Sequence, residues 1–167
     1  MHIASFKPAV FMLSILALAA CGDPGPRTHD SKGRAMATTA MATTVFMNVC
    51  FNTGANRKGE LRAINKDKNI VLTSKPDESF LFASHKTHSI DITIMSEVCS
   101  VSFDTGETST KAGSDAALLL LPKVGAKSMG GSPGGGQLNL KTRKGTVVVA
   151  NGEKAKRFGA ILYLYTY

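Results

Sequence analysis

Three cysteines are the residues of this chain best suited to covalent chemistry. They stand at Cys21, Cys50 and Cys99 of a 167-residue sequence. In an oxidising compartment Cys50 and Cys99 would form a disulfide, and closing a loop of about 50 residues stabilises a fold by roughly 4 kcal/mol on the chain-entropy model. The alternative is a reactive Cys50 whose base is a histidine, such as His85 or His88. We expect the disulfide, with Cys21 left as the odd cysteine.

The histidines form a weaker pattern. His85 and His88 are spaced as H-x-x-H, but a metal site needs a third ligand. Their neighbours are polar and precede a predicted strand at Ile90, so we interpret both as surface histidines in a loop. His29 stands alone in a polar segment. The sequence therefore predicts no metal site and no cofactor.

Residues 130–136 (GGSPGGG) are rich in glycine, as phosphate-binding loops are. No Lys-Ser or Lys-Thr pair follows them, so the phosphate-binding pattern is incomplete. Gly131-Ser132-Pro133-Gly134 does not complete the G-x-S-x-G pattern of hydrolases. We interpret this segment as a mobile loop between strands. Because no nucleophile, base and acid can be named together, we predict that the protein is not an enzyme.

The amino-terminal residues have the pattern of a secretory signal peptide. A short basic start at residues 1–7 precedes an eleven-residue apolar run at 8–18, which is too short for a stable membrane span. At the end of this run, Leu18-Ala19-Ala20-Cys21 resembles the lipobox of bacterial lipoproteins, and the resemblance covers residues 1–22.

This resemblance implies that residues 1–20 are removed and that the Cys21 thiol carries a diacylglyceryl group, with acylation of the new amino group as well. Two or three acyl chains give stable membrane attachment. By the same resemblance, Gly22 in place of Asp implies an outer-membrane position facing the periplasm, in a host that has one. Ordinary cleavage after Ala17-Leu18-Ala19 is the alternative, and it would leave Cys21 as a free thiol.

Residues 21–44 are predicted to form the lipidated cysteine and a flexible tether. The segment 22–44 is rich in Gly, Pro, Thr and charged residues and contains the near-duplicate MATTAMATT. Its typical reach would be about 25 Å. The folded domain is then expected at residues 45–167.

The net charge narrows the choice of partners. Twenty Lys and Arg against twelve Asp and Glu give +8, and the basic residues are scattered along the chain. We expect a solvated surface with mild attraction to the membrane or to an anionic surface polymer. No nucleic acid partner is expected, because aromatic residues make up only 7% of the chain and Trp is absent, whereas single-strand binders stack bases on aromatic side chains.

Alternation of apolar and polar residues predicts several strands. Segments 90–94 and 99–103 would form a hairpin with one buried face, and Cys99 lies on its apolar side. A further strand is expected at 138–141, followed by a turn at Lys144-Gly145 and a β-branched strand at 146–150. Asn151-Gly152 favours a tight hairpin leading to a last strand at 159–167.

Helices are expected to be few. Residues 53–66 could form a helix with Leu61, Ala63 and Ile64 inward, although Gly54 and Gly59 disfavour it. Residues 114–122 remain ambiguous, since Ser114 could cap a short helix that ends at Pro122 or 118–121 could be a buried strand. At least five strands without alternating helices predict one small antiparallel β-sheet domain, α+β or mainly β, with one or two short helices.

Three functions are compatible with these features. The first is a membrane-anchored lipoprotein with a non-catalytic binding or structural role in the cell envelope, acting on another envelope protein or on an anionic polymer. The second is an envelope enzyme with an unidentified site. The third is a small outer-membrane β-barrel, because the alternation around Tyr163, Tyr165 and the terminal Tyr167 resembles the closing strand of such barrels. We favour the first, because the aromatic residues are not distributed as the girdles of a barrel.

Overall fold

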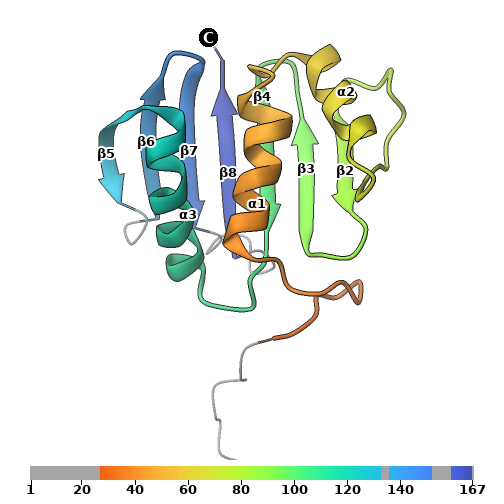
Figure 1. The fold of residues 1–167 in the computed structure, drawn as a ribbon, viewed down its shortest axis with the longest axis horizontal. Helices are drawn as coiled ribbons and strands as arrows, with labels where there is room; N and C mark the ends of the chain where they lie inside the picture. Colours follow the sequence, from red (N-terminus) through yellow and green to blue (C-terminus); the bar gives the residue numbers. More distant parts are fainter. Residues whose placement is uncertain (1–26, 133–135, 152–158, 167) are drawn as a thin grey trace, which may run out of the picture.

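Eight strands assemble into one antiparallel sheet in the computed structural model, which describes residues 27–132, 136–151 and 159–166. The strand order is β1-β2-β3-β4-β8-β7-β6-β5, so β1 and β5 are the edges. Helices α1 and α3 lie side by side across one face of the sheet (Figure 1). The expected antiparallel α+β or mainly β domain is confirmed.

The helices are α1 (Thr39–Phe46), the π-helix η1 (Met47–Phe51), α2 (Arg57–Lys66) and α3 (Ser109–Val124). The strands are β1 (Ile70–Leu72), β2 (Leu81–His85), β3 (Ile90–Ile94), β4 (Val98–Phe103), β5 (Lys127–Ser132), β6 (Gln137–Thr142), β7 (Gly145–Asn151) and β8 (Ala160–Tyr165).

Strands β3 and β4 form the hairpin predicted for residues 90–103. Ile92 pairs with Val101 and Ile94 pairs with Cys99, and each of these side chains is at most 1% exposed. Successive side chains of a strand point to opposite faces. The apolar members therefore face α1 and the polar members face away from it.

Strands β7 and β8 pair antiparallel, with Asn151 opposite Ala160 and Val149 opposite Leu162. The last strand begins at Ala160, one residue after the predicted start. Gly152 of the predicted Asn151-Gly152 turn lies outside the described residues.

The glycine-rich segment is also corrected in part. Gly130, Gly131 and Ser132 belong to β5 and pair with β6, so they are not a loop. A Cβ atom on Gly131 would lie 2.2 Å from the backbone oxygen of Gln137. Glycine therefore permits the close approach of the two strands here. Residues 133–135 lie outside the described part of the chain.

The ambiguous segment 114–122 is helical. It is part of α3, which begins after its N-cap Thr108 and ends at Gly125 with a left-handed C-cap, so neither Ser114 nor Pro122 bounds it. Ala112, Ala116 and Leu120 recur at intervals of four and are fully buried, which matches one face of a helix. At 16 residues, α3 is the longest described helix, and no helix in the described ranges is long and apolar enough to cross a membrane.

Two halves of the chain share one plan. In each, a helix is followed by four antiparallel strands in sequence order, first α1 with β1 to β4 and then α3 with β5 to β8. α2 is an addition to the first half. The halves meet where β4 pairs antiparallel with β8 at the centre of the sheet, with Val101 opposite Leu162. The last strand in the sequence therefore lies in the middle of the sheet.

The predicted flexible tether is wrong for residues 27–44, which are part of the folded domain. Arg34 is 8% exposed, and its guanidinium donates to Asp30 at 2.7 Å and to both Asp91 oxygens at 2.9 Å. Residues 39–44 already belong to α1. Composition alone suggested a linker, but a buried arginine paired with two carboxylates fastens this segment to β3.

Candidate functional site

Two cavities lie beside the π-helix η1. π-Helical turns are uncommon in proteins and are frequent at functional sites. We call the first cavity the amide pocket and the second the basic pocket. The amide pocket, of about 680 Å³, is lined by Asn48, Val49, Asn52, Ala63, Lys66, Asp67, Lys68 and Asn69. The basic pocket, of about 380 Å³, is lined by Phe51, Pro122, Lys123, Val124, Gly125, Arg143 and Lys144.

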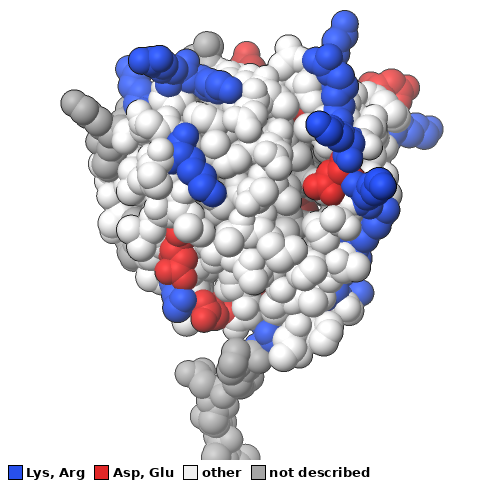
Figure 2. All heavy atoms as spheres, viewed as in Figure 1, with Lys and Arg blue, Asp and Glu red and all other residues white. Residues whose placement is uncertain are grey.

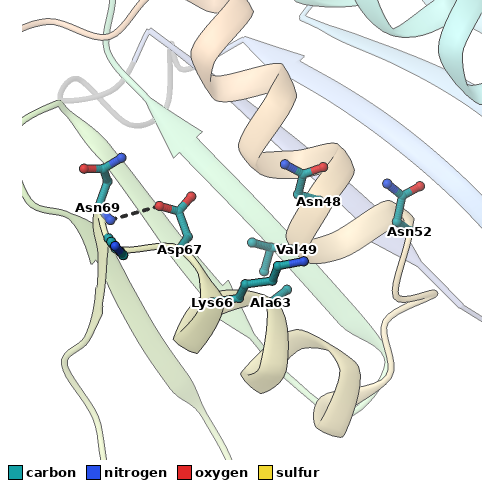
Figure 3. Close-up of a pocket in the computed structure, with 8 residues that line it drawn as sticks. Asn48, Val49, Asn52, Ala63, Lys66, Asp67 and Asn69 are labelled. Carbon is teal, nitrogen blue, oxygen red and sulfur yellow. Dashed lines mark hydrogen bonds between the residues drawn. The ribbon is translucent and has the colours of Figure 1, made fainter.

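The amide pocket lies between η1 and the end of α2. Figure 3 shows Asn48 on η1, Asn52 just after its end, and Lys66 reaching toward them from α2. Asp67 ends α2, and its side chain accepts a hydrogen bond from the backbone of Asn69 at 2.9 Å. This turn holds Asn69 at the mouth of the pocket.

Side-chain amides are the main polar groups of this pocket. Asn48, Asn52 and Asn69 are exposed. An amide side chain both donates and accepts hydrogen bonds. The pocket therefore offers donors and acceptors over an apolar floor of Val49 and Ala63.

The basic pocket lies between η1, the end of α3 and the turn from β6 to β7. Lys144 in that turn donates to the backbone oxygen of Asn52 at 3.0 Å, and its ammonium group lies 5.2 Å from the centre of the Phe51 ring. Since Asn52 also lines the amide pocket, Lys144 connects the two cavities.

Positive charge dominates both pockets. Their lining residues include the five cations Lys66, Lys68, Lys123, Arg143 and Lys144 and the single acid Asp67. Figure 2 shows Lys and Arg at the upper left and the upper right of the face that carries α1 and α3, with some acidic side chains beside those on the right and largely uncharged surface between the two groups. This end of the domain therefore suits an extended anionic ligand.

Cys50 and Cys99, the residues predicted to form a disulfide, are joined in the structure. The bond connects η1 to β4, and both residues are fully buried. Cys50 is consequently not available as the reactive thiol of the alternative hypothesis. Cys21 lies outside the described residues, as does the leader of residues 1–20.

The two histidines lie close together, but they are not both on the surface. His85 ends β2 and is 6% exposed, while the rings of His85 and His88 are 5.0 Å apart. The backbone N–H groups of Thr87 and His88 both donate to Nδ1 of His85. Burial, and the nearby charge of His88, lower the pKa of His85. No group of three or more His, Cys, Asp or Glu in the described ranges could hold a metal ion.

A third cavity contains charges that neutralise one another. It measures about 320 Å³ and lies between the amino-terminal segment and β3, with Asp30, Arg34 and Asp91 among its lining residues. Burial would raise the pKa of Asp30, but hydrogen bonds from Arg34 and from the Lys32 backbone outweigh it and hold that pKa at about 2. These ion pairs hold the amino-terminal segment against β3.

Glu60 is a buried acid that sequence reasoning missed. It is 0% exposed on α2, and neither carboxyl oxygen has a hydrogen-bond partner among the described residues. Burial raises the pKa of Glu60 to about 7, against the opposing effect of the Arg57 charge. Ile64, one turn later, is buried as predicted, whereas Leu61 and Ala63 are half-buried. The helical spacing of Glu60 and Ile64 was the signal that could have identified it.

The pocket residues were also missed. From the sequence alone, Lys66, Lys68 and Lys144 are scattered surface charges, and Asn48 has no predicted role. No periodic signal connects residues of η1 with the turn between β6 and β7, because only the tertiary fold brings them together.

Comparisons of the chain with protein-family models, with curated proteins and with solved structures find no match.

Proposed function

We propose that the chain is an exported lipoprotein, attached to a membrane of the cell envelope through lipid on Cys21. The residues that support the anchor are Leu18-Ala19-Ala20-Cys21 at the end of an apolar leader. The chain has three cysteines, and the bond between Cys50 and Cys99 leaves Cys21 as the odd one. Lipidation would give that cysteine a role.

The folded domain, on this proposal, has a non-catalytic binding role. The observation that carries this proposal is the position of the two pockets relative to the first described residues of the chain. Figure 1 shows the described amino-terminal segment, coloured orange, at one end of the sheet, while α2 and the turn between β6 and β7 lie at the opposite end. The residues between Cys21 and Arg27 can span at most about 20 Å. An anchored domain would therefore direct its pockets away from its membrane.

Replacing Cys21 tests the anchor. In a Cys21→Ser variant expressed in a bacterial host, we expect no incorporation of radiolabelled palmitate and no removal of the leader, because the lipid transfer that precedes cleavage needs a thiol. Gel mobility and labelling of the parent chain provide the comparison. Recovery of a cleaved, membrane-bound Cys21→Ser protein would contradict the proposed anchor.

A Cys50→Ser variant is the matched control for Cys21→Ser. In a Cys50→Ser variant the lipobox is intact, so palmitate labelling and removal of the leader should continue even if the folded domain becomes less stable. Loss of labelling in both variants would show that labelling depends on folding of the domain and would overturn the assignment to Cys21.

A further inference from the structure

The amide pocket and the basic pocket are neighbours on either side of one contact. Asn52 lines the first, Lys144 lines the second, and the two are joined by a hydrogen bond of 3.0 Å. The volumes of the two cavities, about 680 and 380 Å³, would hold several units of a chain rather than one small ion. A polymer that crosses η1 would contact both.

The groups that line the two pockets point to a particular kind of polymer. Each pocket has cations, Lys66 and Lys68 in the amide pocket and Lys123 and Arg143 in the basic pocket, and the amide pocket adds the side chains of three asparagines. Amides exchange hydrogen bonds with hydroxyl groups, whereas ammonium and guanidinium groups bind carboxylate or phosphate. The matching ligand carries many hydroxyls and acidic groups at intervals.

Nucleic acid fits this surface less well. Single-strand binders place several aromatic rings where bases can stack on them. Phe51 is the one aromatic residue lining the two pockets; it is only 8% exposed, and the Lys144 ammonium lies over its ring. The surface therefore provides charge and hydrogen bonds but no stacking platform.

We propose that the two pockets together bind an acidic polysaccharide, with the lysines and Arg143 pairing with its acidic groups and the asparagines with its hydroxyls. This inference rests on the proposed binding role and names the ligand class. If the proposed anchor holds the amino-terminal end of the sheet at the membrane, the polysaccharide would be a component of the layer beyond that membrane.

The test is binding of polygalacturonate to the purified mature protein, measured by biolayer interferometry at low salt. A Lys66→Gln/Lys123→Gln/Arg143→Gln variant removes pocket charge and leaves Lys144 in place. Its affinity should fall about tenfold, because each exposed ion pair contributes little alone and three are lost together. The matched control, Lys58→Gln/Lys75→Gln/Lys141→Gln, removes the same charge outside both pockets and should bind as the parent does.

A second variant separates sugar recognition from general charge attraction. Asn48→Ala/Asn69→Ala leaves the net charge unchanged, so its affinity for polygalacturonate should fall severalfold while its affinity for dextran sulfate stays the same. Thermal unfolding followed by circular dichroism would confirm that every variant is folded.

Several outcomes would overturn the inference. They are absence of binding to polygalacturonate, equal losses in the two charge variants, and tighter binding of a single-stranded DNA oligonucleotide than of polygalacturonate. Because the measurement uses purified protein, its result is independent of lipidation. Absence of polysaccharide binding would not contradict the proposed lipidation of Cys21. Absence of lipidation would not contradict a measured binding of the polysaccharide.

Discussion

A Cys50→Ala/Cys99→Ala variant is expected to lose about 2–5 kcal/mol of unfolding free energy relative to the parent. The disulfide joins residues 49 positions apart and connects η1 to the central strand β4. Without it, the unfolded chain gains conformational freedom, and two fully buried side chains lose atoms from the core. This loss is a large share of the 5–15 kcal/mol by which domains are typically stable.

Denaturation by urea, followed by circular dichroism, would measure this loss. Cys21→Ser serves as the control, because Cys21 is not part of the bond and its replacement should leave the denaturation midpoint unchanged. A double variant with the same midpoint as the parent would contradict the stabilising role. Peptide mapping without reduction provides a direct check, and we expect one peptide pair linked through Cys50 and Cys99.

Glu60 is expected to make the stability of the domain fall as the pH rises. Its pKa is raised from 4.5 to about 7 in the folded protein by burial, so the folded state holds this proton more tightly than the unfolded state does. The contribution of protonated Glu60 to the unfolding free energy is therefore complete below about pH 4.5 and is lost as the pH rises through about 7. A shift of this size corresponds to roughly 3 kcal/mol.

A Glu60→Gln variant tests this contribution, because glutamine keeps the shape of the side chain and does not ionise. The unfolding free energy of the parent should drop by about 3 kcal/mol relative to the variant between pH 4.5 and 8. Burying the glutamine amide can change the unfolding free energy by an amount that does not depend on pH. The comparison therefore uses the change of unfolding free energy with pH and not its value at one pH. Glu97→Gln, at an exposed position, should leave the profile of the parent unchanged. Parallel profiles for the parent and Glu60→Gln would refute the prediction.

Glu60 also bears on the amide pocket. Ala63, which lines that pocket, lies on the same face of α2 one turn after Glu60. α2 contacts η1 and β1, so ionisation of Glu60 would weaken the packing that positions Lys66 and Asn69. The unfolding measurement and the binding measurement should accordingly be made at one stated pH.

Local pattern in the sequence determined much of this protein. Alternation at residues 90–103 predicted the β3–β4 hairpin, because a period of two describes a strand with one buried face wherever it occurs. The odd number of cysteines, together with the position of Cys99 on the apolar side of the hairpin, predicted the disulfide. The leader and its lipobox are likewise local features, and they remain predictions that chemistry on Cys21 will test.

Tertiary structure decided what depends on residues far apart in the chain. Residues 27–44 have the composition of a linker, but Arg34 is buried by pairing with Asp91, 57 positions later. β8 became the central strand because its apolar residues match both β4 and β7, and nothing in its local sequence predicts that it pairs with β4. The pockets combine η1, α2, the end of α3 and the β6–β7 turn. No window of sequence contains all four, so only packing against a common core could bring their amides and cations to one surface.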